Sequence, residues 1–278
     1  MVDCNGIGSI AAENAVPGAY SSECMSLTTR NIKLKSTNED VIIVQGSADG
    51  QGVTGRTGVA LWNSGLLLTR TLDFMAQEER DFFQGKTVLE LGCGTGLASI
   101  AASKFGAANV IATDGNEEVV KLAKQNLENN NIYASTNSQS SSERTGEAQY
   151  LKWGSLDVAD FYDTADIVIG SDLTYNSGSW GLLSETVNDI LKPSGLFCYV
   201  TLGHAGFNVA SELGGFLTLV DSQGSLEVVK EGSSAWPFQN VPSLEKMVFS
   251  SLTFKEREVI AGTGGFKVVL FRKRKKRR

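Results

Sequence analysis

The sequence has few of the residues that define metal-binding and disulfide-rich proteins. Its 278 residues include four cysteines and one histidine. The cysteines lie far apart and form no C-x-x-C pair, which argues against a structural zinc site and against a disulfide scaffold. We therefore expect no metal site. Reduced thiols are typical of the cytoplasm or the nucleus, and we expect the protein to lie in one or both of these compartments.

Long apolar runs are also missing. No stretch approaches 18 consecutive apolar residues, and the first ten residues lack the basic start and apolar core of a secretory signal. Hydrophobic residues make up 41% of the sequence and the mean hydropathy is −0.08, values typical of folded soluble domains. We expect an intracellular protein without a membrane partner, built as one α/β domain with extensions.

Charge is distributed unevenly along the chain. The net charge is −6, yet the seven residues from Arg272 to Arg278 are all lysine or arginine. Without them the 25 basic residues become 18 against 31 acidic ones, so the rest of the chain carries about −13. Such an acidic body repels nucleic-acid phosphates and attracts basic protein surfaces. The terminal run itself is interpreted as a solvated tail, a nuclear-localisation signal or a nucleic-acid contact.

Composition divides the chain into a central domain and flanking segments. Residues 1–30 are rich in Ser, Ala, Asn and Gly without periodicity, which predicts a mobile N-terminal arm. Residues 31–272 are expected to form the domain, beginning with a hairpin within 31–44, and residues 273–278 a basic tail. A polar, low-complexity tract at about 131–148 is interpreted as a surface insertion.

From residue 86 onward, strand patterns alternate with helical patterns. The expected strands are residues 87–91, 109–113, 149–153, 166–171 and 196–202. The expected helices among them are residues 97–105, 117–130 and 179–191. Residues 253–260 and 266–271 are expected to form a C-terminal antiparallel hairpin. This alternation predicts a mostly parallel sheet with helices on both faces.

The segment E-L-G-C-G-T-G joins the first of these strands to a helix. It contains Glu90, Gly92, Gly94 and Gly96. Glycines in such a turn let the backbone approach a ligand closely and leave N–H groups available at the helix start. Asp114 ends the next strand, where a carboxylate can accept hydrogen bonds from both hydroxyls of a ribose. Together these residues predict an adenosine nucleoside bound across the strand ends.

A dinucleotide such as NAD contains such a nucleoside. A dinucleotide fingerprint, G-x-G-x-x-G, requires a third glycine at the position of Leu97. The observed G-x-G-x-G, preceded two residues earlier by an acid, instead resembles motif I of the class I, seven-β-strand S-adenosylmethionine (SAM) methyltransferases, and Asp114 matches the acidic residue that ends their second strand. The resemblance implies SAM as cofactor and a Rossmann-like α/β fold with a seven-stranded sheet.

Three further segments resemble the family-16 protein methyltransferases, which mostly modify lysine side chains of non-histone proteins. The segment S-D-L-T-Y, with Ser171, Asp172 and Tyr175, is similar to their D-x-x-Y signature. Trp62 in T-G-V-A-L-W and Trp153 in L-K-W-G resemble the two tryptophan-bearing stretches of that family. The matching segments extend over roughly half of the chain.

This resemblance implies that a protein lysine is methylated by SAM. Asp172, at a strand end beside the expected sulfonium, would orient the amine, and Tyr175 would form a hydrogen bond at the mouth of the channel. These two are the candidate catalytic residues. The candidate cofactor-binding residues are Trp62, Glu90, Gly92, Gly94, Gly96, Asp114, Trp153 and Ser171. We expect a monomer whose partner is a lysine-bearing protein.

Structural alternatives stand beside several of these assignments. Trp62 and Trp153 would also fit as core aromatics, since tryptophan is usually well buried. Asp172 would also fit as a turn-capping residue, and Tyr175 as a packed one. The single histidine, His204, lacks a Cys or Ser partner at a recognisable spacing and is interpreted as structural.

Functional alternatives are methylation of protein histidine, of a small molecule or of nucleic acid, and a non-catalytic SAM-binding module. Nucleic-acid amino methyltransferases commonly carry an N/D-P-P-Y/F motif, whereas this chain has D-L-T-Y at the corresponding place. The D-x-x-Y segment does not distinguish a lysine acceptor from a histidine acceptor.

Overall fold

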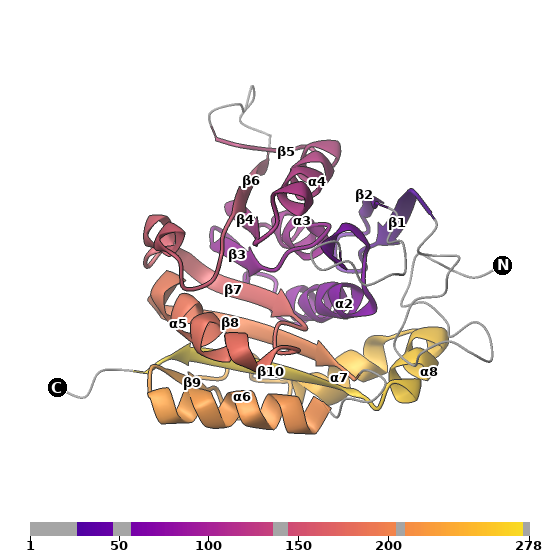
Figure 1. The fold of residues 1–278 in the computed structure, drawn as a ribbon. Coiled ribbons are helices and arrows are strands. Elements are labelled where there is room, and N and C mark those ends of the chain that lie inside the picture. The colour runs from indigo at the N-terminus through magenta and orange to yellow at the C-terminus, as the bar shows by residue number, and fades with distance from the viewer. Residues whose placement is uncertain (1–26, 47–56, 136–143, 204–208, 275–278) are drawn as a thin grey trace.

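A computed structural model describes residues 27–46, 57–135, 144–203 and 209–274. An α/β arrangement fills these ranges, with one large sheet between two layers of helices (Figure 1). Most of the expected N-terminal arm, the last four residues of the basic tail and His204 lie outside the described residues. None of the described helices has both the length and the apolar character needed to cross a bilayer.

The central sheet has eight strands. In spatial order they are β5 (Ile132–Tyr133), β6 (Arg144–Tyr150), β4 (Asn109–Asp114), β3 (Thr87–Leu91), β7 (Ala165–Ser171), β8 (Leu191–Leu202), β10 (Phe266–Lys273) and β9 (Leu226–Val228). The strands from β5 to β8 are parallel, whereas β10 runs antiparallel to both β8 and β9. The predicted Rossmann-like fold with C-terminal antiparallel strands is confirmed, with one strand more than the seven expected.

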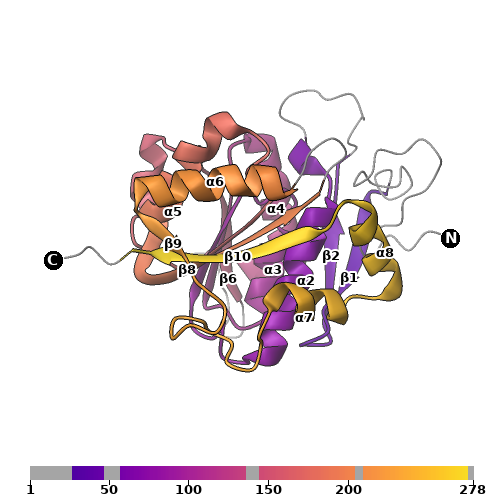
Figure 2. The same cartoon turned by 90° about the horizontal axis from the view of Figure 1, so that it is seen from below.

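Helices cover both faces of the sheet (Figure 2). They are α2 (Asn63–Glu78), α3 (Leu97–Lys104), α4 (Glu117–Asn129), α5 (Trp180–Ile190), α6 (Val209–Gln223), α7 (Leu244–Ser251) and α8 (Phe254–Gly262). Buried side chains of α2, α3, α4, α7 and α8 form one hydrophobic cluster, and those of α5 and α6 form another on the opposite face. Since parallel strands end at one edge of a sheet, loops that follow β3, β4 and β7 meet there.

A separate hairpin of β1 (Thr29–Lys33) and β2 (Asp40–Val44) lies against α4 and confirms the predicted hairpin. Two asparagines of α4 hydrogen-bond to the backbone of β2. The amide of Asn126 binds both the N–H and the carbonyl of Val44, and Asn130 does the same for Ile42. Asn126 also donates to the carbonyl of Thr95, so it connects the hairpin with the loop after β3.

The expected strand at 253–260 is wrong, because these residues form α8 and its N-cap. Thr253 and Glu256 make a capping box: the Thr253 hydroxyl accepts from the Glu256 N–H at 3.3 Å, and the Glu256 carboxylate accepts from the Thr253 N–H at 2.8 Å. This T-x-x-E pattern is a helix-start signal that outweighs the short β-like alternation. The antiparallel partners of β10 are instead β8 and β9.

The strand expected at 149–153 begins earlier, at Arg144, and ends at Tyr150. Six of its residues pair with β4, from Thr145 opposite Asn109 to Tyr150 opposite Asp114. The tract expected as an insertion therefore contributes β5 at its start and part of β6 at its end, and residues 136–143 lie outside the described residues. Pairing with β4 overrides the polar composition of these residues.

Candidate active site

The loop between β3 and α3, residues 92–96, has a backbone that favours glycine at three positions. Gly92, Gly94 and Gly96 have φ angles of 60°, 53° and 78°, all in the left-handed region. A Cβ on Gly94 would lie 3.2 Å from the carbonyl oxygen of Gly58. This glycine loop therefore lies in close backbone contact with the segment that precedes α2.

Asp114 ends β4 beside the glycine loop. One carboxylate oxygen, Oδ2, accepts a hydrogen bond from the Gly94 N–H at 3.3 Å, and Oδ1 accepts from the Asn116 N–H at 3.1 Å. Burial raises the pKa of the Asp114 carboxyl, and these backbone hydrogen bonds oppose that rise. The structure thus brings together the two parts predicted to bind a nucleoside, namely the loop with its N–H groups and the acidic strand end.

Glu90 lies in β3 beneath this loop and is 4% exposed. Its Oε2 accepts hydrogen bonds from the Ser99 N–H at 2.9 Å and from the Ser99 hydroxyl at 2.6 Å. Burial raises the pKa of the Glu90 carboxyl to about 7, although the bonds from Ser99 lower it. Both bonds go to the first turn of α3, so Glu90 fixes that helix relative to β3. Its predicted contact with a cofactor stays a prediction.

The segment from Thr57 to Trp62 lies against the glycine loop. It forms a short 3₁₀ helix and then reaches Trp62, the half-buried N-cap residue of α2. A Cβ on Gly58 would lie 2.9 Å from Val119 of α4 and 3.6 Å from the Cα of Gly94. The tryptophan-bearing segment and the glycine loop, more than 30 residues apart in the sequence, are therefore packed together.

Trp153 lies just after the end of β6, where the pairing of β6 with β4 stops. The N–H of Leu151 donates to the carbonyl of Asp114 at 3.0 Å, which continues the pairing past the end of the strand. Trp153 is half-buried and packs against the hydrophobic cluster on the α5 and α6 face. Gly154 then donates to the Thr186 hydroxyl of α5 at 3.0 Å. Part of the Trp153 side chain therefore packs in the hydrophobic core, and its contact with adenine stays a prediction.

The D-x-x-Y segment follows β7, whose last residue is the half-buried Ser171. Asp172 has a φ of 50°, which is uncommon for a residue other than glycine. Its N–H donates to the carbonyl of Val200 at 3.0 Å. Its Oδ1 accepts from the Thr201 hydroxyl at 3.0 Å and from the Leu202 N–H at 2.8 Å. The carboxylate of Asp172 therefore joins the loop after β7 to the end of β8.

Thr174 and Tyr175, in the same 172–175 loop, differ sharply in exposure. Thr174 is 1% exposed and its N–H donates to the hydroxyl of Tyr199 in β8 at 3.2 Å. Tyr175 is 71% exposed, so the alternative of a packed tyrosine is wrong. The sequence reasoning missed Thr174, Tyr199 and Thr201. A signal for two of them was present, since polar-headed Tyr199 and Thr201 alternate in the apolar run of β8.

Leu173 connects the 172–175 loop with the glycine loop. A Cβ on Gly92 would lie 2.8 Å from one methyl carbon of Leu173, and a Cβ on Gly170 would lie 2.6 Å from the other. Glycine at both positions makes room for this buried leucine. The loops that follow β3 and β7 are therefore in van der Waals contact at the edge of the sheet.

The buried thiols near this site are not suited to nucleophilic chemistry. Burial raises the pKa of Cys93, within the glycine loop, well above its ordinary value and that of Cys198 in β8 to about 12. A thiol that stays protonated at neutral pH is a poor nucleophile, which fits the interpretation of Cys93 as a small turn residue. In the described ranges, no three His, Cys, Asp or Glu side chains gather as metal ligands.

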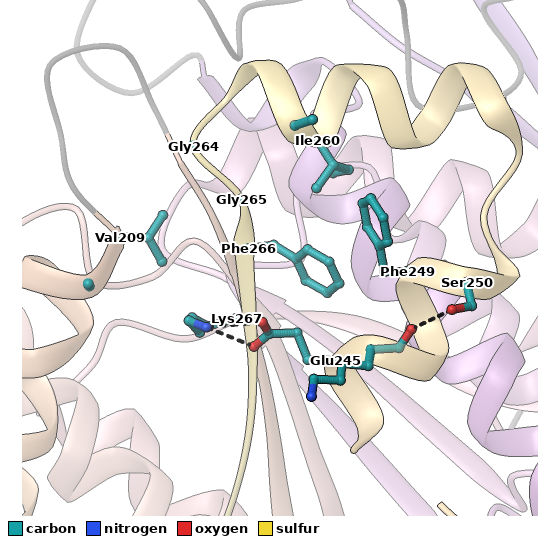
Figure 3. A pocket seen from close by; sticks show the side chains of 12 residues that line it. Val209, Glu245, Phe249, Ser250, Ile260, Gly264, Gly265, Phe266 and Lys267 are labelled. Carbon is teal, nitrogen blue, oxygen red and sulfur yellow. Dashed lines mark hydrogen bonds and ion pairs between the residues drawn. The ribbon is translucent and has the colours of Figure 1, made fainter. Parts of the chain in front are cut away.

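A cavity of about 550 Å³ lies at the start of β10 (Figure 3). Its walls come from α7, the first residues of α6 and β10, and the end of α8. Phe249 and Phe266 stack in it with ring centroids 6.4 Å apart, and Glu245 forms an ion pair with Lys267 at 3.0 Å. Phe266 pairs in the sheet with Leu202 of β8, and the N–H of Leu202 donates to the Asp172 carboxylate. None of the residues predicted for the site lines this cavity.

Comparison with known proteins shows which family has this arrangement. The calmodulin-lysine N-methyltransferase of Arabidopsis thaliana is 32% identical over 122 residues, which is 44% of this chain and 38% of that protein. The protein-lysine N-methyltransferase EFM3 of Chaetomium thermophilum is 31% identical over 145 residues, or 50% of this chain and 40% of that protein. The matches thus span less than half the length of either relative.

A solved structure supports the fold. The protein SMU.776, complexed with SAH, superposes on 90% of this chain with a TM-score of 0.51 and 15% sequence identity, over 57% of its own length. The model of the family described as lysine methyltransferase matches residues 29–207, more than half of the chain. This match includes the glycine loop, Asp114 and the 172–175 loop. The chain belongs to the lysine methyltransferase family.

Proposed function

We propose that the protein is a SAM-dependent methyltransferase that modifies a lysine side chain of a non-histone protein. The observation that carries the proposal is the contact of two loops at one edge of the sheet. The glycine loop with Asp114 has the groups expected for a nucleoside, and Leu173 joins it to the 172–175 loop. Both loops lie within the part of the chain that matches the lysine methyltransferase family.

The residues at the ends of β3 and β4 fit this cofactor. The left-handed Gly94 lets the loop approach the Gly58 carbonyl closely, where a Cβ would lie 3.2 Å from that oxygen. The start of α3, which follows this loop, would offer N–H groups to the cofactor. The carboxylate of Asp114 would accept hydrogen bonds from the ribose hydroxyls. Trp62, before the glycine loop in the sequence, and Trp153, after Asp114, would form apolar walls for the adenine or the methionine moiety. Ser171 would lie where the cofactor site meets the site of the acceptor lysine.

When bound, SAM supplies an electrophilic methyl group on its sulfonium. The residues of this chain must then hold an unprotonated lysine Nζ in line with that group and exclude water from it. Asp172 and the backbone carbonyls of the 172–175 loop would orient the amine through its N–H groups. Tyr175, exposed at the end of this loop, would hydrogen-bond to the substrate as it enters. Such a reaction requires positioning and does not require a strong base.

The relatives and the charge of the chain support a class of substrate, and the basic tail supports a location. The names of the relatives, a calmodulin-lysine and a protein-lysine N-methyltransferase, support a protein acceptor. Apart from its terminal basic run the chain is strongly acidic, which favours a substrate with a basic surface around the lysine. We further propose that the protein acts as a monomer in the cytoplasm, the nucleus or both, with the basic tail as a nuclear-localisation signal.

Transfer of tritium from labelled SAM tests this function. The protein is incubated with labelled SAM and a cell extract, and the labelled species are identified by mass spectrometry. We expect label on lysine in a small number of proteins, and much less label at limiting SAM with an Asp114→Ala variant as control. Label confined to nucleic acid, to small molecules or to histidine would contradict the proposal.

A further inference from the structure

Thr174, in the middle of the 172–175 loop, has each of its polar groups hydrogen-bonded. Its N–H donates to the Tyr199 hydroxyl at 3.2 Å, and its own hydroxyl shares a hydrogen bond with the same oxygen at 2.9 Å. Its carbonyl accepts from the indole N–H of Trp180 at 2.8 Å. Two of these three bonds depend on one hydroxyl group, that of Tyr199.

Tyr199 is itself rigidly placed. Its side chain is fully buried, and its ring packs against those of Phe197 and Phe216, with centroid distances of 5.7 and 6.3 Å. Burial raises the pKa of the Tyr199 hydroxyl, so the group keeps its proton at neutral pH. In the sheet Tyr199 pairs with Gly170, two residues before Asp172. The Tyr199 hydroxyl is therefore held in one position, from which it can hydrogen-bond to the 172–175 loop.

The loop needs such support from outside itself. Asp172 has a left-handed backbone, a conformation that persists in a residue other than glycine only when the surroundings hold it. Tyr175, at the other end, is largely exposed and so adds little packing. Hydrogen bonds with Val200, Thr201 and Leu202 hold Asp172, but they do not reach the second half of the loop.

From this geometry we infer that Tyr199 is a positioning residue, whose hydroxyl holds the 172–175 loop in the shape that presents Asp172 and Tyr175 to the acceptor lysine. The inference rests on the proposed function as far as it concerns the acceptor. The structural part of the inference is that the buried Tyr199 hydroxyl orders the 172–175 loop, and this part rests only on the hydrogen bonds. Tyr199 does not touch the reacting atoms and acts through Thr174 and through its hydrogen bond with the Thr201 side chain.

The test compares Tyr199→Phe with Thr71→Val, a matched loss of one buried hydroxyl. Thr71 is fully buried in α2, where its hydroxyl donates to the carbonyl of Leu67. Three quantities are measured for each variant: amide hydrogen exchange of the loop, SAM affinity by calorimetry, and turnover on the labelled protein of the extract. For Tyr199→Phe we expect exchange at Thr174 to accelerate at least about tenfold and turnover to fall about tenfold or more.

SAM affinity is expected to change less than about twofold, because the Tyr199 hydroxyl contacts no part of the glycine loop. Thr71→Val is expected to leave loop exchange and turnover unchanged. A second variant, Thr174→Val, removes the partner hydroxyl, and its effect on turnover should shrink when Tyr199→Phe is already present.

Unchanged exchange of the loop in Tyr199→Phe would overturn the inference, whether or not the protein methylates lysine. Faster exchange with unchanged turnover would also overturn it, since the loop would then be ordered for stability alone. If the wild-type protein transfers no methyl group to any protein, the proposed function fails, and loop exchange still decides whether Tyr199 orders the loop.

Discussion

The glycine loop and the 172–175 loop lie at the same edge of the sheet, and both contain residues with left-handed backbone conformation. The two loops maintain that conformation in different ways. Gly94 has a φ of 53° and Asp172 a φ of 50°. Glycine adopts this conformation without steric cost, whereas aspartate pays on the order of 1 kcal/mol or more. Three hydrogen bonds with β8 hold Asp172: its N–H donates to the Val200 carbonyl, and its carboxylate accepts from Thr201 and Leu202, 29 and 30 positions later.

This difference separates the expected effects of mutation. The glycine loop owes its left-handed turns to its own glycines, and it lies beside Asp114. Changes at the ends of β3 and β4 should therefore act mainly on cofactor affinity. The 172–175 loop owes its shape to β8, so changes there should act on turnover and leave cofactor affinity largely intact. Substitutions in the two loops and at Asp114 test this division.

The largest effect is expected for turnover at Asp172. Asp172→Ala leaves the N–H of Leu202 and the hydroxyl of Thr201 without their acceptor and keeps a strained backbone. A resulting displacement of about 1 Å can lower turnover on the order of 100-fold. SAM affinity should change by less than about 1 kcal/mol. Initial rates of methyl transfer and calorimetric titration with SAM measure the two effects.

Asp172→Asn is the matched control for that variant. Asparagine keeps an oxygen acceptor and tolerates positive φ, so it preserves the bonds to β8 while it removes the charge. Turnover near the wild-type level would show that Asp172 acts by holding the loop, whereas a loss equal to that of Asp172→Ala would show that its negative charge acts on the amine. Normal turnover in both variants would place the acceptor site elsewhere.

Affinity for SAM should fall most at Asp114. Asp114→Ala removes the acceptor predicted for the ribose hydroxyls and the partner of the Gly94 N–H, a loss of about 1.5–3 kcal/mol. Calorimetry with SAM measures it, and thermal unfolding shows that the fold stays cooperative. NADH serves as the control ligand: SAM at about 100 times its dissociation constant should stabilise the wild type by about 2.7 kcal/mol, and NADH should not. Unchanged SAM affinity would mean that the nucleoside is bound elsewhere.

Stability should depend on pH through Glu90. Its pKa is raised from about 4.5 to about 7 in the folded protein, so the unfolded chain releases this proton first as pH rises. The stabilisation present below pH 4.5 is lost progressively up to about pH 7 and above, by about 3 kcal/mol in total.

Glu90→Gln removes this titration and keeps an oxygen that can accept from Ser99. Between pH 5 and pH 8 the wild type should therefore lose about 2–3 kcal/mol of unfolding free energy relative to the variant. Urea titrations of both proteins at the two pH values measure the difference. A difference that stays constant over this range would show that Glu90 is ionised throughout.

A smaller effect is expected at Tyr175. Tyr175→Phe removes one exposed hydroxyl and leaves the hydrogen bonds of Thr174 in place, so turnover should fall by less than about tenfold. The Michaelis constant for the protein substrate is expected to rise more than the turnover number falls, since the hydroxyl meets the substrate at entry. A loss as large as that of Asp172→Ala would indicate that Tyr175 contacts the reacting amine.

No effect on the site is expected from the basic tail. Replacing residues 275–278 by alanine keeps the ion pairs of Lys273 with Asp163 and of Arg274 with Asp221, which lie at the far end of β10. SAM affinity and turnover should be unchanged, while nuclear signal of a tagged protein should fall. Unaltered distribution in cells would refute the targeting role of the tail.

Local sequence patterns predicted one half of the site better than the other. The glycine turn is recognisable because its backbone conformation restricts which residues can stand there. Asp114 is recognisable because it ends the next apolar strand. At the second half, Asp172 and Tyr175 were identified by resemblance, but the support from Tyr199 and Thr201 was not, because an apolar strand does not show which of its polar groups faces a distant loop. The helix α8 was missed although its capping box was present, because a short alternation of polar and apolar residues fits either period.

The sequence by itself determined the alternation of strands and helices, the glycine loop and the acid at the end of β4, because each depends on local periodicity or on a residue's own backbone preferences. Only the tertiary structure decided the pairing of β6 with β4, the buried hydrogen bonds of Glu90 with Ser99 and the hydrogen bonds that hold the 172–175 loop. These features need groups from separate strands and helices to lie within about 3 Å of one another, a condition that exists only once the sheet has assembled.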